Sequence, residues 1–203
     1  FKKVYYDAVR GRAVSKFVPA EDVVIPYNTT DMESCERITH VVKIMGNELR
    51  KKQVGGMYRD IDISESPVDK NDASKKYDEL DGVTETYNAE DIVLLEFHCD
   101  LDIPGFEDKN ATTGEPTGIK LPYVVTVDEG SGKVLSIYRN YAEGDLLRKK
   151  IQYFVHYKFL PGLGFYGFGL IHMLGGLSRT ATSALRQLID AGTLANLPAG
   201  FKA

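Results

Sequence analysis

Residues 170–195 read LIHMLGGLSRTATSALRQLIDAGTLA, and this stretch decides the class of the fold. Apolar and small residues recur in it at spacings that alternate between four and three, which is typical of one face of an α-helix. Together they form what we call the apolar stripe: Leu170, Leu174, Leu177, Ala181, Ala184, Leu188, Ala191 and Ala195. Ile171, Leu185 and Ile189 widen it. The pattern predicts a helix of about 26 residues, roughly 39 Å long at 1.5 Å per residue.

The predicted helix needs a partner to cover the apolar stripe, and the alanines would let another helix approach closely. No second long helix is predicted elsewhere in the chain. We therefore expect the stripe to pack against another subunit or against a part of a longer protein. Arg179 and Arg186 are seven residues apart and share one face of the helix. They are either a solvated surface or a row of positive charge repeated by symmetry around a pore.

Residues that break helices flank this segment on both sides. Four glycines fall within eight residues before it, mixed with aromatic side chains, and predict a hinge. These glycines are Gly162, Gly164, Gly167 and Gly169. The sequence NLPAG at 196–200 predicts the end of the helix. Hinge and helix together form a segment at 163–197.

The first 162 residues carry the alternation of apolar and polar residues that is typical of β-strands. We expect strands at 4–6, 13–18, 22–27, 37–45, 92–102, 120–127, 133–139 and 151–159, with the first two in a hairpin. The turn DEGSG at 128–132 predicts a second hairpin. Asn47 predicts the N-cap of a short helix that stops at Gly55 and Gly56. The fold class is therefore α+β, a β-rich unit of mostly antiparallel strands (1–162) followed by one long helix.

Composition places the chain among globular proteins. It has 203 residues, of which 43% are hydrophobic, and a net charge of −4. The charge is uneven, because residues 60–110 hold 16 acids and 4 bases, and polar residues at 64–91 predict a mobile acidic surface excursion. Nothing in this balance favours tight general binding to nucleic acid. No apolar run is long enough for a membrane span.

Cysteine usage favours a reducing compartment. We expect Cys99 to be a buried free thiol, because it continues the apolar alternation of residues 93–101. The chain begins at Phe1 and stops without an obvious ending, so we interpret it as a piece of a longer protein.

One motif favours enzymatic chemistry. Residues 162–167 read GLGFYG and match the fingerprint of dinucleotide-binding loops. That fingerprint also needs a returning parallel strand, and Phe165 and Tyr166 would crowd the phosphate position, so we prefer a hinge. The histidines show no metal-ligand spacing, with His98 and His156 on the polar faces of their strands, and no nucleophile motif is present. We expect no catalysis, cofactor or metal, and keep a nucleotide-binding enzyme domain as the alternative.

Several segments resemble the portal proteins of tailed bacteriophages, most closely those of short-tailed phages and prophages. The most specific are FVHYKFLPGLGFYGFGLIH at 154–172 and RQLIDAGTLANLP at 186–198. Earlier similar segments are FVPAED at 17–22, VIPY at 24–27, RITH at 37–40, LRK at 49–51, YRD at 58–60 and GIKLPY at 118–123. The similarity spans nearly the whole chain apart from residues 64–91.

The resemblance implies a structural protein that forms a ring, usually of twelve copies, at one capsid vertex of the virion, assembled in the host cytoplasm. Terminase drives double-stranded DNA through such a ring, and capsid, scaffolding, head-completion and tail-adaptor proteins attach to it. Residues 1–162 then resemble the wing, the helix after Leu170 a stem helix packed on neighbouring stem helices, and 198–203 the start of the clip. Arg179 and Arg186 become candidates for channel-facing positions. Another capsid or tail adaptor is a further alternative.

Overall fold

The computed structural model describes residues 1–7, 11–63, 75–76, 79–80, 82, 91–110, 112–162 and 164–196. The chain divides into two compact units, Phe1–His156 and Tyr157–Ala203. The predicted acidic excursion at 64–91 lies almost entirely outside the described residues, as do residues 197–203. Antiparallel sheets followed by one long helix confirm the α+β class. Among the described residues, no helix is both long and apolar enough to cross a membrane.

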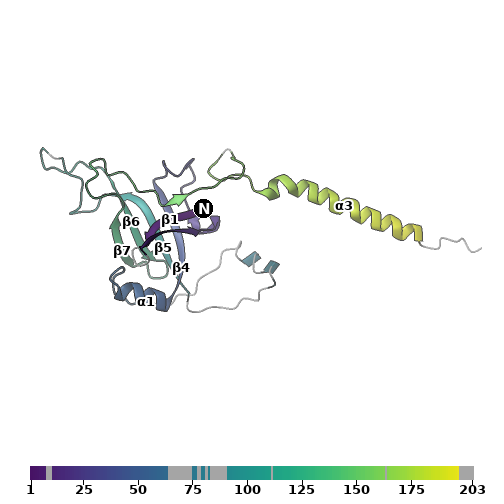
Figure 1. Ribbon diagram of the computed structural model, residues 1–203, viewed down its shortest axis with the longest axis horizontal. Coiled ribbons are helices and arrows are strands. Elements are labelled where there is room, and N and C mark those ends of the chain that lie inside the picture. The colour runs from purple at the N-terminus through teal and green to yellow at the C-terminus, as the bar shows by residue number, and fades with distance from the viewer. Residues whose placement is uncertain are drawn as a thin grey trace, which may run out of the picture. The chain divides into compact units, whose positions relative to one another are not determined.

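A five-stranded antiparallel sheet is the main element of the first unit (Figure 1). Its strands, in spatial order, are β3 (Val23–Val24), β4 (Arg37–Met45), β5 (Asp91–Leu101), β6 (Leu121–Asp128) and β7 (Val134–Arg139). β4 pairs with β5 along its whole length. The turn between β6 and β7 confirms the predicted hairpin, and the side chain of Asp128 stabilises this turn by accepting a hydrogen bond from the backbone N–H of Ser131 at 2.8 Å.

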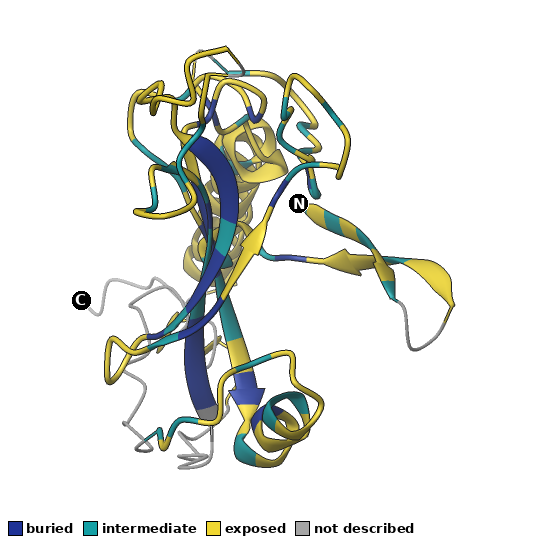
Figure 2. Cartoon of the chain, turned by 90° about the vertical axis from the view of Figure 1, so that its left-hand side faces the viewer, coloured by how far each residue is buried: buried dark blue, intermediate teal, exposed yellow. Residues whose placement is uncertain are grey.

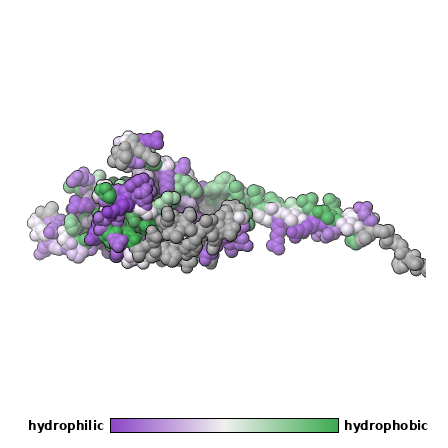
Figure 3. All heavy atoms as spheres, turned by 90° about the horizontal axis from the view of Figure 1, so that it is seen from below, coloured by the Kyte–Doolittle hydropathy of each residue, from purple (hydrophilic) through white to green (hydrophobic). Residues whose placement is uncertain are grey.

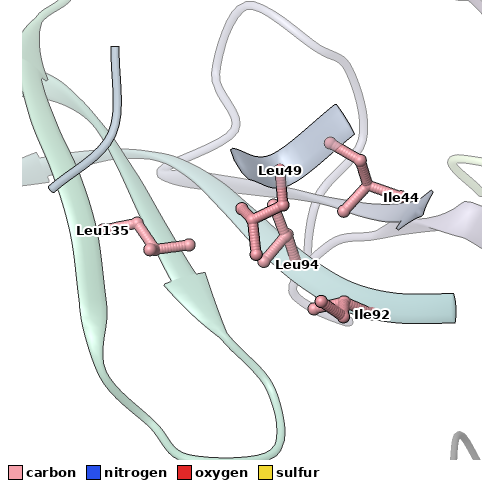
Figure 4. Packing of buried hydrophobic residues seen from close by; sticks show 5 residues of the cluster. All are labelled: Ile44, Leu49, Ile92, Leu94 and Leu135. Atoms are coloured by element: carbon pink, nitrogen blue, oxygen red, sulfur yellow. The ribbon is translucent and has the colours of Figure 1, made fainter. Parts of the chain in front are cut away.

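Apolar side chains cover both faces of this sheet. On one face, α1 (Gly46–Val54) places Leu49 against four strand residues (Figure 4). The cluster consists of Ile44, Leu49, Ile92, Leu94 and Leu135. A second cluster of Leu121, Tyr123 and Val125 lies on the opposite face, together with half-buried Phe97 and Leu101. The alternation of apolar and polar residues in β5 predicts one buried and one exposed face. Both faces are buried or half-buried for most of its length, so this prediction is wrong for the polar face.

Removing one side chain from the first cluster tests this packing. Leu135 is fully buried, so Leu135→Ala leaves a cavity and should lower the free energy of unfolding by about 2–5 kcal/mol. Urea denaturation measures the change. Leu146→Ala is the matched control, because Leu146 is 97% exposed and its truncation should change the stability little. Equal losses in the two variants would contradict the packing.

A smaller three-stranded antiparallel sheet completes the first unit. It contains β1 (Lys2–Asp7), β2 (Arg12–Phe17) and β8 (Phe154–Val155), in the order β2-β1-β8. The predicted hairpin of the first two strands is thus confirmed. Outward-facing residues of this hairpin are exposed along its length (Figure 2). The hairpin projects from the rest of the unit, and its Lys2–Lys3 end pairs with β8 (Figure 2).

Three predicted boundaries are wrong, each for a local reason. The strand expected at 151–159 shrinks to β8, because only the Lys2–Lys3 end of β1 pairs with it. The strand expected at 22–27 shrinks to β3, which follows a 3-10 helix η1 (Ala20–Asp22) and precedes Pro26, a residue without a backbone N–H. Asn47 is not an N-cap, because β4 runs directly into α1 and the cap position is Met45. The predicted stop is correct: α1 ends before Gly55, and Gly56 has a φ of 73°.

Candidate functional site

The long helix α3 (Leu170–Asn196) confirms the helix predicted at 170–195. None of its 27 residues is buried, and the leucines of the apolar stripe are 52–71% exposed. Figure 3 shows apolar residues gathered along one side of the helix. In an ordinary globular protein, a stripe of this width faces a core. Here the described residues provide no cover for it.

The two arginines lie on the face opposite the apolar stripe. At about 100° per residue, Arg179 and Arg186 point roughly 160–180° away from Leu170 and Leu188. Both arginines line a shallow groove of about 820 Å³, which also reaches Leu170 and Leu174 at the beginning of the apolar stripe. A partner centred on the later part of the stripe, around Leu188, would leave both guanidinium groups on the opposite face of the helix.

Intrinsic helix stability is low along α3. Gly175, Gly176 and Gly192 lie inside it, and a glycine costs about 1 kcal/mol relative to alanine at such a position. Added methyl groups would meet nothing within 4 Å at any of the three. Most of the stability of helices in proteins comes from packing an apolar face. The glycines and the uncovered stripe together indicate a helix that is completed by a partner.

The glycine loop, residues 160–169, connects β8 to α3 and is closed at its base. Leu160 and Phe168 form an antiparallel bridge, in which the N–H of Phe168 donates to the carbonyl of Leu160 at 2.8 Å. A Cβ atom on Gly167 would lie 2.6 Å from the carbonyl oxygen of Leu160. On Gly162 it would lie 3.0 Å from the carbonyl oxygen of Tyr166. These glycines permit close backbone approach, and their role as a hinge stays a prediction.

Aromatic side chains fill the described part of this loop, and a histidine of α3 contacts its end. Phe165 is buried and meets Tyr166 edge to face, with the amine of Lys158 5.8 Å from its ring centre. Nδ1 of His172, the third residue of α3, accepts a hydrogen bond from the N–H of Gly169, which precedes the helix, at 3.3 Å. The sequence did not predict this contact, because Glu or Gln is the usual residue at that position.

Substitution at Gly167 tests the closed loop. Gly167→Val places a side chain against the carbonyl of Leu160, so the bridge between Leu160 and Phe168 must open. We expect chymotrypsin to cleave after Phe165 at least several-fold faster than in the unsubstituted chain. Gly164→Ala is the control, because its Cβ meets nothing within 4 Å and cleavage should stay slow. Equal cleavage rates in the two variants would show that the loop is not closed in solution.

The dinucleotide fingerprint at 162–167 is not set in the framework that it requires. The strand before it, β8, is two residues long and antiparallel to its partner, and every strand pair in the described part of the chain is antiparallel. α3 begins three residues after Gly167, and the ring of Phe165 is buried within the motif. A pyrophosphate site of this type needs a parallel βαβ unit with the helix end aimed at the phosphates.

A buried charged cluster, formed by Lys3, His40, Glu96 and His98, lies between the two sheets. Glu96 contacts the amine of Lys3, and its Oε1 atom lies 2.5 Å from Nε2 of His98. His40 is the cross-strand partner of Glu96. Sequence reasoning missed this cluster because it placed His98 on a polar face, whereas His98 is only 3% exposed. Cys99, expected to be buried, is half-buried, and Cys35 is the buried free thiol.

Electrostatics in the cluster favour ionised Glu96 and neutral His40. Burial by itself raises the pKa of Glu96, but the hydrogen bond with His98 and the charge of Lys3 outweigh it and lower this pKa to about 2. Burial and then the charge of Lys3 lower the pKa of His40 to about 4. Among the described residues, no three His, Cys, Asp or Glu side chains converge on a metal position.

No protein-family model matches the chain, and no curated protein matches it.

Proposed function

We propose that this chain is part of a bacteriophage portal protein, with the β-rich unit as wing and α3 as a stem helix in a ring at the capsid vertex. The observation that carries the proposal is the apolar stripe, which is exposed over the whole length of a 27-residue helix. The helix follows an antiparallel β-rich unit, as the portal order of parts requires. The portal-like segments at 154–172 and 186–198 flank and include the same helix.

Burial of the apolar stripe supplies the free energy for the ring. Each leucine that moves from water into an interface contributes about 1.5–3 kcal/mol, and a ring repeats the contact at every subunit. Ala181 and Ala184 lie in the stripe and permit close approach of the neighbouring helix. The stripe is therefore the proposed oligomer interface, with about twelve copies per ring as in the family it resembles.

The opposite face of α3 would then face the channel or the surrounding water. Arg179 and Arg186 provide positive charge there, and isolated arginines attract the DNA phosphates without fixing a sequence. A net charge of −4 for the whole chain suits brief contacts with double-stranded DNA. In this function the chain performs no catalysis, and terminase, capsid, scaffolding and head-completion or tail-adaptor proteins are its proposed partners.

Electron microscopy of the complete gene product tests the proposal. We expect closed rings with a central channel when the purified protein is imaged. A sample that contains only monomers, or rings without a channel, would reject the portal assignment. Rings with a channel that bind capsid or tail proteins but not terminase would favour another capsid or tail adaptor.

The match of residues 162–167 to the dinucleotide fingerprint supports one alternative, a nucleotide-binding enzyme domain. Titration with dinucleotides and ATP separates the two functions. A portal fragment should bind none of them, whereas an enzyme domain should show saturable micromolar binding that Gly164→Val abolishes. Gly130→Ala in the β6–β7 turn serves as a control for the substitution.

A further inference from the structure

We propose that the buried charged cluster is an acid-sensitive latch, which holds the Lys3 end of the β1–β2 hairpin against the five-stranded sheet at neutral pH and releases it in acid. The proposal rests on the contacts between the two sheets and is independent of the portal assignment. Its central feature is that one carboxylate, from Glu96, serves several positively charged or protonatable groups from both sheets.

The latch joins the sheets through two neighbouring side chains of the smaller one. Lys3 of β1 and Phe154 of β8 are register partners, and the amine of Lys3 lies 5.6 Å from the centre of the Phe154 ring. This ring meets His40 and His98 edge to face, at centroid distances of 5.6 and 5.1 Å. Lys3 and Phe154 thus cover both histidines, and Lys3 contacts the carboxylate of Glu96.

Protonation changes the balance of charge inside the cluster. At neutral pH, the Lys3 ammonium faces the Glu96 carboxylate, and His40 is uncharged. His40 is only 5% exposed, and within the described part of the chain its Nδ1 atom has no hydrogen-bond partner. A proton on His40 adds a buried positive charge beside Lys3, and no second carboxylate is present among the groups that act on His40.

The other groups around the latch increase this imbalance. Lys16 of β2 lowers the pKa of His40, as Lys3 does, whereas Glu96 raises it. Lys52 of α1, Tyr58 and Tyr153 interact with Glu96 but supply no negative charge at neutral or acidic pH. β3 contributes Val23, which pairs with His40 and does not titrate.

Release of the hairpin takes the charges of Lys3 and Lys16 away from His40 and opens its surroundings to water. The pKa of His40 then rises from about 4 in the docked state toward its ordinary value of 6.5. The released state therefore binds more protons between these values, and falling pH favours it. Protonation of Glu96, with a docked pKa of about 2, removes the remaining ion pair at still lower pH.

The hairpin can leave without unfolding the rest of the unit. No residue of β1 or β2 is fully buried. The Lys2–Lys3 end of β1 pairs with β8, and the N–H of Val4 donates a hydrogen bond to the carbonyl of Tyr153 at 2.7 Å. The part that can be released ends at Val18, which follows β2 and is only 1% exposed. The five-stranded sheet retains its two apolar clusters, which contain no hairpin residue. Elements with few buried contacts open before the global transition.

Nuclear magnetic resonance of the whole 203-residue chain during an acid titration tests the latch. From about pH 7 to about pH 3.5 we expect the amide signal of Val4 to move to its unfolded position, while that of Val125 in β6 stays native. The released population should begin to rise below about pH 6.5 and should rise most steeply between 6.5 and 4, the ordinary and docked pKa values of His40. Simultaneous loss of both signals, or no change in Val4, would overturn the proposal.

Two substitutions separate the latch from general acid denaturation. His40→Gln removes the titrating group and should lower the released population near pH 4 about tenfold or more, whereas His172→Gln, on α3, should leave it unchanged. Glu96→Gln should release the hairpin already at neutral pH, and Glu48→Gln on the exposed surface of α1 should not. If His40→Gln fails to fold, Glu96→Gln still decides: a docked hairpin at neutral pH in that variant would reject the latch.

Discussion

Replacing Leu177 or Leu188 by Asp in the complete gene product will abolish ring formation and leave the β-rich unit folded. The two side chains are 69% and 71% exposed in the single chain, so a charge there disturbs no internal contact. In a ring, the same carboxylates would lie in an apolar interface, where an unpaired charge costs several kcal/mol at each copy. Electron microscopy and sedimentation measure the loss of rings, and circular dichroism shows whether the fold is retained.

Ser183→Asp is the matched control for this prediction. Ser183 points roughly 140° away from Leu188 around the helix, so the new carboxylate should stay in water and the rings should persist. Rings that survive Leu177→Asp, with a folded β-rich unit, would show that the apolar stripe is not the interface. Loss of rings in all three variants would show only a general sensitivity of α3 to negative charge, which would also contradict the proposed face.

Replacing Glu96 by Leu will lower the free energy of unfolding by about 3–5 kcal/mol. The side chains of Lys3 and Glu96 are 14% and 16% exposed, so the substitution either leaves a largely buried ammonium without its carboxylate or releases the hairpin, and both outcomes lower the stability. It also removes the hydrogen-bond partner of His98. Urea denaturation near pH 7 measures the loss of stability. This loss should be among the largest for the substitution of a single buried side chain in this unit.

A double substitution identifies the cause of that loss. Lys3→Met in the Glu96→Leu background removes the unpaired charge and should restore a large part of the stability, giving a coupling energy of more than about 1 kcal/mol. Glu48→Leu, which breaks the exposed pair with Lys51, should change the stability little. Additive effects of the Lys3 and Glu96 substitutions would mean that the ion pair does not connect the two sheets.

Local periodicity predicted the elements whose neighbours in sequence determine them. The strand at 37–45, the β6–β7 hairpin and the helix from Leu170 all follow from alternation, turn residues or the spacing of the stripe. The position of the apolar stripe on one helix face is likewise a local property. These features need no knowledge of which other segments lie nearby.

Contacts between distant segments explain what the sequence did not predict. The face of β5 that carries Ile92, Leu94, Glu96 and His98 is buried because α1 and residues of the three-stranded sheet cover it. Glu96 and His98 therefore become interior residues. The glycine loop closes because Leu160 meets Phe168, a pairing that no alternation indicates. In both cases a residue type with ordinary surface or hinge behaviour takes another role once a remote partner is present.

The bridge at the base of the glycine loop gives the chain a reserve of length. While Leu160 and Phe168 are paired, the eight steps between them span only the width of two adjacent strands, about 5 Å. Fully extended, the same residues would reach roughly 26–29 Å. Tension applied along α3 would first work against this bridge, and its opening would lengthen the connection by more than 20 Å before any strand of the β-rich unit had to separate.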